Sequence, residues 1–305
     1  MSLYETLLGK IKGKILLGEP MRKHTSLLIG GPVDVMIIPK DVEDITYATK
    51  YAEEKGLPIY VIGNGSKLLV ADHGIHGIII KIANTLDELA VIEESIIAGA
   101  GCFLSKLIRI AIKYNLSGIE FAAGIPGTLG GAITMNAGTY LGSMNDVVEE
   151  VTAMDIPSCS IRVLSNEECH FGFRKSLFQE TKFIILQAKL RLRKGNPDEI
   201  KKRIDELVQK RKRTQPLNVP NAGCIFMNPP GISAGELIDR LGLKGFQVGG
   251  AQISKVHANF IVNSGSATAS DVLRLIQTTL ERVQNIFGIK LEPEIRILGM
   301  TLEHT

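Results

Sequence analysis

The sequence predicts an α+β fold built from three packed units. The chain has 305 residues, which exceeds the usual size of a single hydrophobic core. Strand-like and helix-like segments alternate along it, as in folds with mixed layers. The pattern of these segments changes near residues 80 and 195, so we expect units over residues 1–80, 81–195 and 196–305.

The first unit is predicted to interleave strands with one helix. Strands are expected over residues 33–39, 59–62 and 77–82. Asp41 can cap the helix and Gly56 can end it. The apolar face of this helix is formed by Val42, Ile45, Ala48 and Ala52.

The second and third units differ in their balance of elements. In the second, strands over residues 95–100, 148–155 and 184–191 flank a helix that begins near Leu104 and ends near Asn115. In the third, Ser233 and Glu236 have the spacing of a capping box, and Gly288 ends a long helix. An earlier helix and a final strand complete this unit, with the helix face formed by Ile200, Ile204, Leu207 and Val208 and the strand spanning residues 290–298.

The composition is that of a globular protein acting on small anionic molecules. Hydrophobic residues make up 45% and charged residues 22%, and the net charge of +3 is too weak to indicate nucleic acid. No apolar segment is long enough to span a membrane, and the N-terminus does not resemble a signal peptide. The 4 cysteines have no CxxC spacing, so we expect neither a zinc site nor disulfides, but a cytoplasmic protein.

Two glycine-rich segments have the composition of phosphate-binding loops. Residues 63–66 follow a predicted strand directly, and residues 124–132 are followed by a second short glycine motif at 135–138. Glycine allows backbone N–H groups to converge on an anion, and Thr128 and Asn136 add side-chain hydrogen bonds. Neither segment has the spacing of a Rossmann or Walker motif. Composition alone leaves both tight turns and phosphate loops open.

Motifs in collinear order along nearly the whole chain add a more specific signal. They occupy residues 24–25, 29–32, 62–70, 118–132, 135–138, 171–174, 221–229, 249–251, 257–263 and 291–296. In these motifs the sequence closely resembles the UDP-N-acetylenolpyruvoylglucosamine reductase family. The resemblance implies a two-part FAD-binding region of the vanillyl-alcohol-oxidase (PCMH) type, followed by an α/β substrate-binding domain. It also implies the shorter subtype, which lacks an extra tyrosine-bearing loop.

The resemblance further implies the reaction. Noncovalent FAD and NADPH would reduce the enolpyruvyl ether of UDP-N-acetylglucosamine enolpyruvate, giving UDP-N-acetylmuramate for peptidoglycan synthesis. Negative charge develops at C2 and spreads into the carboxylate, so the reaction needs a carboxylate clamp and a proton donor. The partner implied is therefore a UDP-sugar, with no nucleic acid and no membrane, and the protein is expected to be a monomer.

Three residues match the catalytic positions of the family. Arg174 would bind the carboxylate, although an arginine in this setting is also a common turn or surface residue. Cys224, where most members have serine, would protonate C2, because a thiol is a stronger acid than a hydroxyl. A lone cysteine is otherwise most often a small buried hydrophobe.

Glu294 is the third catalytic match, and would stabilise or protonate the intermediate. In the predicted strand it shares one face with Glu292 and Arg296, so a structural acid–base pair is the alternative. Glu292 is the second candidate for the same role.

The remaining site residues are carried over from matching motifs. FAD would be held by Ile62, Gly63, Asn64, Gly65, Ser66, Leu68, Leu69, Ala123, Gly124, Pro126, Gly127, Thr128, Gly130, Gly131, Ala132, Asn136 and Arg296. The substrate would be held by Phe173, Arg213, Asn228, His257 and Asn259. No metal site is expected, because the His73 and His76 pair has no cysteine or carboxylate partners.

Three departures from the family pattern keep other functions open. Besides Cys224, Phe173 replaces a tyrosine and Met227 replaces a lysine, which puts diphosphate or NADPH contacts at these points in doubt. A different flavin dehydrogenase of the same fold is one alternative. A degenerate flavoprotein that only binds or scaffolds is the other, and it would be colourless when purified.

Overall fold

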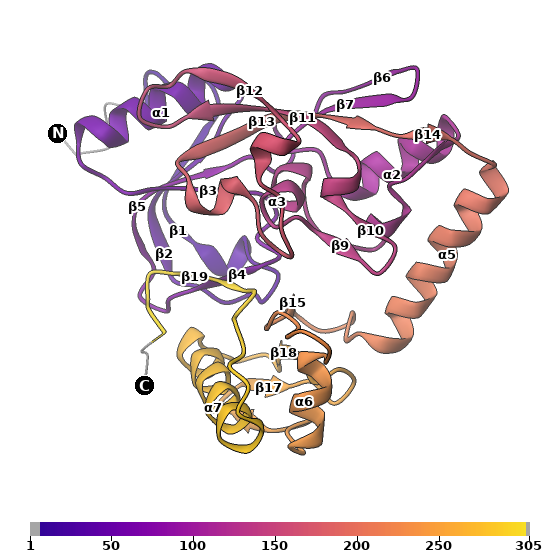
Figure 1. Ribbon diagram of the computed structural model, residues 1–305. Coiled ribbons are helices and arrows are strands. Elements are labelled where there is room, and N and C mark those ends of the chain that lie inside the picture. The colour runs from indigo at the N-terminus through magenta and orange to yellow at the C-terminus, as the bar shows by residue number, and fades with distance from the viewer. Residues whose placement is uncertain (1–6, 303–305) are drawn as a thin grey trace. The chain divides into compact units, whose positions relative to one another are not determined.

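The computed structural model describes residues 7–302, which form two compact units assembled from discontinuous segments (Figure 1). Unit 1 contains the described residues up to Leu17, then Asp34–Asn64 and Gly77–Gln209. Unit 2 contains Gly18–Val33, Gly65–His76 and the described residues from Lys210 onward. These units differ from the three expected ranges, because two short N-terminal segments pack with the C-terminal third.

A four-stranded sheet, largely in unit 1, follows the predicted alternation of strand and helix. Its strand order is β1-β2-β5-β3, and β3 runs parallel to β5. Helix α1 (Val42–Glu54) connects β2 to β3 and buries Ile45 and Ala48, as the apolar face predicted. The strands are β1 (Lys14–Pro20), β2 (Pro32–Ile38), β3 (Ile59–Ile62) and β5 (Ile75–Lys81).

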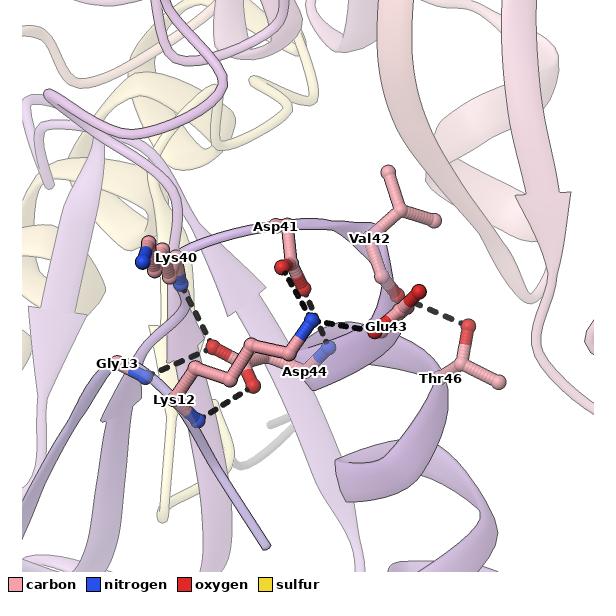
Figure 2. A network of polar contacts seen from close by, with 8 residues as sticks. All are labelled: Lys12, Gly13, Lys40, Asp41, Val42, Glu43, Asp44 and Thr46. Carbon is pink, nitrogen blue, oxygen red and sulfur yellow. Dashed lines mark hydrogen bonds and ion pairs between the residues drawn. The ribbon is translucent and has the colours of Figure 1, made fainter.

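A buried carboxylate fixes the start of α1 (Figure 2). Asp41 caps the helix as predicted, accepting from the Asp44 amide at 3.1 Å. The Asp44 carboxylate, 1% exposed, accepts from the backbone N–H groups of Lys12, Gly13 and Lys40 at 2.7, 2.9 and 2.7 Å. It therefore ties the segment before β1 and the end of β2 to the helix.

Replacing Asp44 with alanine is expected to lower the free energy of unfolding by about 3 kcal/mol, because three backbone donors lose an ionised acceptor. Asp41→Ala, which removes only the cap, is expected to cost about 1 kcal/mol. Urea denaturation of both variants measures the difference. Equal losses for the two variants would contradict the role given to Asp44.

The second sheet of unit 1 is antiparallel throughout, in the order β12-β11-β13-β7-β6. Helix α3 (Leu129–Thr134) packs against β7 and β13, and helix α2 (Leu104–Lys113) against the short strand β8 (Leu116–Ser117). The predicted strands and helix of this region are confirmed within one or two residues. The strands are β6 (Leu89–Ile92), β7 (Ser95–Gly99), β11 (Val148–Asp155), β12 (Ile161–Ser165) and β13 (Phe183–Arg191).

Smaller elements complete unit 1 and lead out of it. Strand β9 (Gly138–Thr139) pairs with β10 (Gly142–Ser143), and β8 pairs with β14 (Arg193–Lys194). A short helix, α4 (Leu177–Glu180), precedes β13. The longer helix α5 (Pro197–Thr214) begins in unit 1 and ends in unit 2.

Unit 2 contains an antiparallel sheet and two helices that pack on each other. Its strand order is β15-β18-β17-β16, and α7 packs on β16 and β17 (Figure 1). Thr268 and Asp271 form a capping box at the start of α7, and Gly288, with φ +69°, ends it as predicted. The elements are β15 (Asn221–Cys224), α6 (Ala234–Arg240), β16 (Gln247–Val248), β17 (Ala251–Ile253), β18 (Phe260–Asn263) and α7 (Ala269–Phe287).

Two expectations for unit 2 were wrong in detail. At α6, Ser233 accepts from the Glu236 amide, but Glu236 pairs with Arg240 instead of completing a capping box. The final strand, β19, spans only Arg296–Leu298, where it runs parallel to β4 (Leu68–Val70). Glu294 therefore precedes the strand.

Pro293 explains the shorter strand, because proline has no N–H to donate to a ladder. It forms an isolated bridge with Phe226, and the chain then continues to β4 as its next partner. The regular alternation expected for Glu292, Glu294 and Arg296 is interrupted. Glu292 and Arg296 are exposed, whereas the Glu294 side chain is only 10% exposed.

Candidate active site

The two glycine-rich loops predicted from sequence meet in unit 1. A β-carbon on Gly63 would lie 2.3 Å from the Thr128 hydroxyl oxygen, a distance that real contacts do not reach. Thr128 is 1% exposed and caps α3, accepting from the Gly131 amide at 3.4 Å. Gly63 is thus required for the close approach of loops that lie far apart in the sequence.

The start of α3 has one covered and one open glycine. Gly130 donates its N–H to the Ala100 carbonyl at 2.9 Å, and a β-carbon there would lie 3.0 Å from the Ala100 β-carbon. The next residue, Gly131, is exposed, and its β-carbon would meet only the Thr128 hydroxyl, at 3.6 Å. The loop therefore presents bare main chain at Gly131.

The other expected cofactor residues divide between the units. Asn136 in unit 1 is 6% exposed, has φ +39°, and donates to the Gly172 carbonyl at 2.8 Å. Its side chain also accepts from the Asn145 amide at 3.0 Å. The unit 2 members include Leu68, whose strand pairs with β19 at Arg296. The unit 2 residues of the set are Gly65, Ser66, Leu68, Leu69 and Arg296.

Arg174 occupies a tight turn in unit 1. Gly172 and Lys175 exchange both backbone hydrogen bonds, at 2.9 and 3.1 Å, across Phe173 and Arg174. Arg174 has φ +58°, a region that costs a residue with a β-carbon roughly 1 kcal/mol or more. Such strain persists where the surrounding structure demands it, so this is more than an ordinary surface turn.

Several contacts hold the Arg174 turn in place. Its guanidinium donates to the Gly138 carbonyl at 2.9 Å, and its own carbonyl accepts from Gln179 at 2.8 Å. The guanidinium carbon lies 5.5 Å from the centre of the Phe173 ring, which is a cation–π distance. Phe173 is 61% exposed, so this face of the turn is open to a ligand.

Unit 2 brings together the other two expected catalytic residues. The Glu294 amide donates to the carbonyl of Ile225, the residue after Cys224, at 2.7 Å. The Lys67 ammonium lies 2.9 Å from Glu294 Oε1 and donates to the Cys224 carbonyl at 2.5 Å. The sequence analysis did not identify Lys67. The available signal was a single cation within an otherwise uncharged glycine loop.

The end of α5 contains a second group that the sequence analysis missed. Arg213, the expected substrate residue, is exposed. Arg211 Nε and Gln215 Oε1 are instead buried, with no hydrogen-bond partner among residues 7–302. Burial lowers the pKa of the Arg211 guanidinium, and the nearby Cys224 thiol opposes this shift. A buried cation and a buried acceptor one turn apart have the capacity to bind a ligand.

The three remaining substrate candidates lie in unit 2 and make internal hydrogen bonds. Asn259, 2% exposed, accepts from the Phe226 amide and donates to the Phe226 carbonyl, at 2.9 and 2.8 Å. His257 Nδ1 accepts from the Asn259 amide at 3.2 Å, and burial lowers the pKa of His257. Asn228 is exposed and accepts from the Ala234 amide at 3.0 Å. Asn259 thus supports the strand that follows Cys224.

The other polar groups considered from sequence have simpler surroundings. Within residues 7–302, no cluster of three or more His, Cys, Asp or Glu side chains could hold a metal ion. The four cysteines, all in the described part of the chain, form no disulfide. Burial raises the pKa of both Cys102 and Cys169 to about 11, so these two thiols are unreactive near neutral pH. None of the described helices is long and apolar enough to cross a membrane.

Comparisons with known proteins assign both parts of the chain. Residues 33–165 match the family described as FAD binding domain, and residues 215–298 match UDP-N-acetylenolpyruvoylglucosamine reductase, C-terminal domain. The UDP-N-acetylenolpyruvoylglucosamine reductase of Caldanaerobacter subterraneus subsp. tengcongensis is 46% identical over 97% of this chain and 99% of that protein. The enzyme of that name from Clostridioides difficile is 43% identical over 97% and 98%.

A solved structure agrees with these relatives. The crystal structure of UDP-N-acetylenolpyruvylglucosamine reductase from Thermus caldophilus is 37% identical in sequence and has a TM-score of 0.78. The match covers 94% of this chain and 99% of that one. Sequence and fold therefore agree over almost the entire length.

Proposed function

Because this chain belongs to the UDP-N-acetylenolpyruvoylglucosamine reductase family, we propose that it reduces UDP-N-acetylglucosamine enolpyruvate to UDP-N-acetylmuramate for peptidoglycan synthesis. The chain is an oxidoreductase that uses FAD and NADPH. The predictions of family, fold and cofactor are confirmed by the matches over nearly full length. The observation that carries the function is the placement of Glu294 beside Cys224 by direct hydrogen bonds.

The described residues fit FAD. Gly63 and Thr128 bring two loops together, and Gly131 leaves its main chain open for a bulky group to approach. We assign FAD binding to these loops, with the predicted residues from Ile62 to Leu69 and from Ala123 to Asn136, and with Arg296. Bound FAD supplies the hydride that NADPH provides and that C3 of the enolpyruvyl group receives.

Gly131→Val tests this assignment, because its added side chain would meet open space in the protein but would occupy the space given to FAD. We expect the affinity for FAD to fall by about tenfold or more, since each 1.4 kcal/mol of lost contact is tenfold. The unfolding free energy of the flavin-free variant should change by less than about 1 kcal/mol, the cost of valine in a helix. Gly131→Ala should have a smaller effect on FAD, as flavin absorbance of the purified proteins would measure. Full flavin occupancy in Gly131→Val would contradict the assignment.

Arg174 is proposed to bind the substrate carboxylate. Its guanidinium is a planar fork that can bind a carboxylate through two hydrogen bonds and stabilise the negative charge that spreads into it from C2. The bond from Arg174 Nη2 to the Gly138 carbonyl fixes the orientation of the fork. The strained backbone holds that geometry before the substrate arrives.

Cys224 is proposed to donate the proton that C2 receives. The S–H bond breaks, the C2–H bond forms, and the thiolate regains its proton from solvent. Glu294 is proposed to stabilise the charge that develops, or to help supply the proton. Its amide is bonded to Ile225, so its carboxylate and the thiol belong to one hydrogen-bonded segment.

The substrate residues remain proposals, with one addition. Phe173, Asn228 and His257 keep their assigned roles, while Asn259 is placed to act through Phe226 rather than by direct contact. Arg211 takes the place of Arg213 as the buried cation on α5, and with Gln215 it is proposed to bind a polar group of the substrate. The exposed Arg213 would contribute at most through its charge.

The cellular setting and the domain plan are also proposed. We place the protein in the cytoplasm as a monomer without a nucleic-acid partner. Its cysteines form no disulfide, which fits a reducing compartment. We retain residues 1–80 and 81–195 as the two parts of the FAD-binding region and 196–305 as the substrate-binding domain, with segments 18–33 and 65–76 joining the last of these in one compact unit.

The function is tested by a pair of anaerobic reactions followed at the flavin absorbance band. NADPH should bleach the band of the yellow protein, and UDP-N-acetylglucosamine enolpyruvate should restore it. A colourless protein that takes up no FAD would support the scaffold alternative. A yellow protein that NADPH bleaches but that the enolpyruvyl sugar does not restore would support a different flavin dehydrogenase.

A further inference from the structure

Lys67 has contacts that the proposed reaction does not yet use. It directly precedes β4, and its side chain is 24% exposed. Its ammonium contacts the Glu294 carboxylate at 2.9 Å and the Cys224 carbonyl at 2.5 Å. One partly buried cation thus contacts both residues to which we assign the proton chemistry.

We propose that Lys67 is a positioning residue that holds Glu294 and Cys224 in one fixed relation. This inference rests on the proposed function, because it acts through the residues assigned there. The Lys67 carbonyl also accepts from the Arg296 amide at 2.8 Å, so main chain and side chain both hold the segment that carries Glu294.

The contacts form a closed ring. Lys67 binds Glu294 through its side chain, and the Glu294 amide binds the Ile225 carbonyl at 2.7 Å. Ile225 follows Cys224, whose carbonyl returns to the Lys67 ammonium. Three segments far apart in the sequence are thereby fixed to one another, and the direction of the Cys224 side chain is set by a main chain that is held on both sides.

An ammonium suits this position better than a neutral group. It offers three donors, and its bonds to a carboxylate and a carbonyl are charge-assisted and stronger than neutral ones. The close approach of the neighbouring main chain adds to this, since a β-carbon on Gly223 would lie 3.5 Å from Lys67 Nζ. A neutral side chain of equal length would fill the space but would leave Glu294 without this cation.

The test replaces Lys67 with methionine in the FAD-loaded protein. We expect recovery of the flavin band by the enolpyruvyl sugar to slow by about a hundredfold, as for a catalytic group displaced by about 1 Å. Bleaching by NADPH should stay within about twofold of the original rate, because it does not involve Cys224 or Glu294. Lys67→Arg, which keeps the charge, should restore most of the lost rate.

Hydrogen exchange gives a readout that does not depend on activity. In Lys67→Met, the Glu294 and Ile295 amides, which donate to Ile225, should exchange faster, and Lys67→Arg should reverse this. Lys106→Met is the matched control, because Lys106 also contacts a carboxylate and a carbonyl, those of Asp87, at 2.6 and 2.9 Å. It should change neither the recovery rate nor exchange at Glu294.

A double-mutant cycle separates positioning from a merely structural role. If Lys67 acts through Glu294, Lys67→Met should add little to the loss already caused by Glu294→Gln. Fully additive losses, or unchanged recovery in Lys67→Met, would overturn the inference. If the unmodified protein itself does not recover its absorbance with the enolpyruvyl sugar, the proposed function fails instead, so the two failures are distinguishable.

Discussion

Replacing Cys224 with alanine is expected to slow recovery of the flavin band by about a thousandfold, the usual effect of losing a general acid. The methyl group of alanine has no proton to transfer, so C2 must take its proton from water or from a less suitable group. Bleaching by NADPH should be unchanged, because that reaction needs no proton from this residue. Rapid mixing of the pre-bleached protein with UDP-N-acetylglucosamine enolpyruvate measures the rate.

Two further cysteine variants give this experiment its controls. Cys224→Ser keeps an O–H donor and should retain much of the recovery rate, although a hydroxyl is a weaker acid than a thiol. Cys159→Ala removes another partly buried cysteine, one whose thiol donates to the Ile156 carbonyl at 3.6 Å, and should have no effect. Normal turnover in Cys224→Ala would remove this residue from the mechanism.

Replacing Arg174 with glycine is expected to lower kcat/KM by about a hundredfold to a thousandfold, through loss of stabilisation of the developing negative charge. The variant should nevertheless fold well. Arg174 has φ +58°, which glycine adopts without steric cost, so the unfolding free energy should stay equal or rise by up to about 1 kcal/mol. A loss of activity would therefore not reflect a damaged turn.

The shape of the guanidinium can be tested separately from its charge. Arg174→Lys keeps the charge but loses the planar fork and should recover only part of the rate. Arg191→Lys is the matched control, since Arg191 binds both oxygens of Glu149, each at 3.0 Å, on the exposed edge of the same unit. Steady-state kinetics of the three variants would be compared with thermal unfolding. Unchanged kcat/KM in Arg174→Gly would exclude Arg174 as the carboxylate clamp.

Elements whose signal is local could be predicted well. Helix α1 begins after Asp41 and is followed by Gly56, and α7 ends at Gly288, because caps and helix ends depend on residues a few positions apart. The final strand could not be predicted in the same way. Its apolar alternation suited a strand from residue 290, but Pro293 interrupts the ladder and only residues 296–298 pair with β4.

The site divides along the same line. Family motifs identified Arg174, Cys224 and Glu294 as candidates, since those residues stand at matching positions in the sequence. They did not identify Lys67 or Arg211, because the importance of these cations comes from burial and from partners more than a hundred residues away. The expected Arg213 lies two positions from Arg211 and is exposed, a difference that only the packing of α5 reveals.

By itself, the sequence determined the family, the use of FAD and the residue types available for the chemistry, because these follow from motifs that are read locally and in order. Only the tertiary structure decided that Gly63 must pass against Thr128, and that Lys67 joins Glu294 to the main chain of Cys224. The physical reason is that a desolvated charge or a missing β-carbon matters through its neighbours in space. Those neighbours come from segments that the linear order of residues does not bring together.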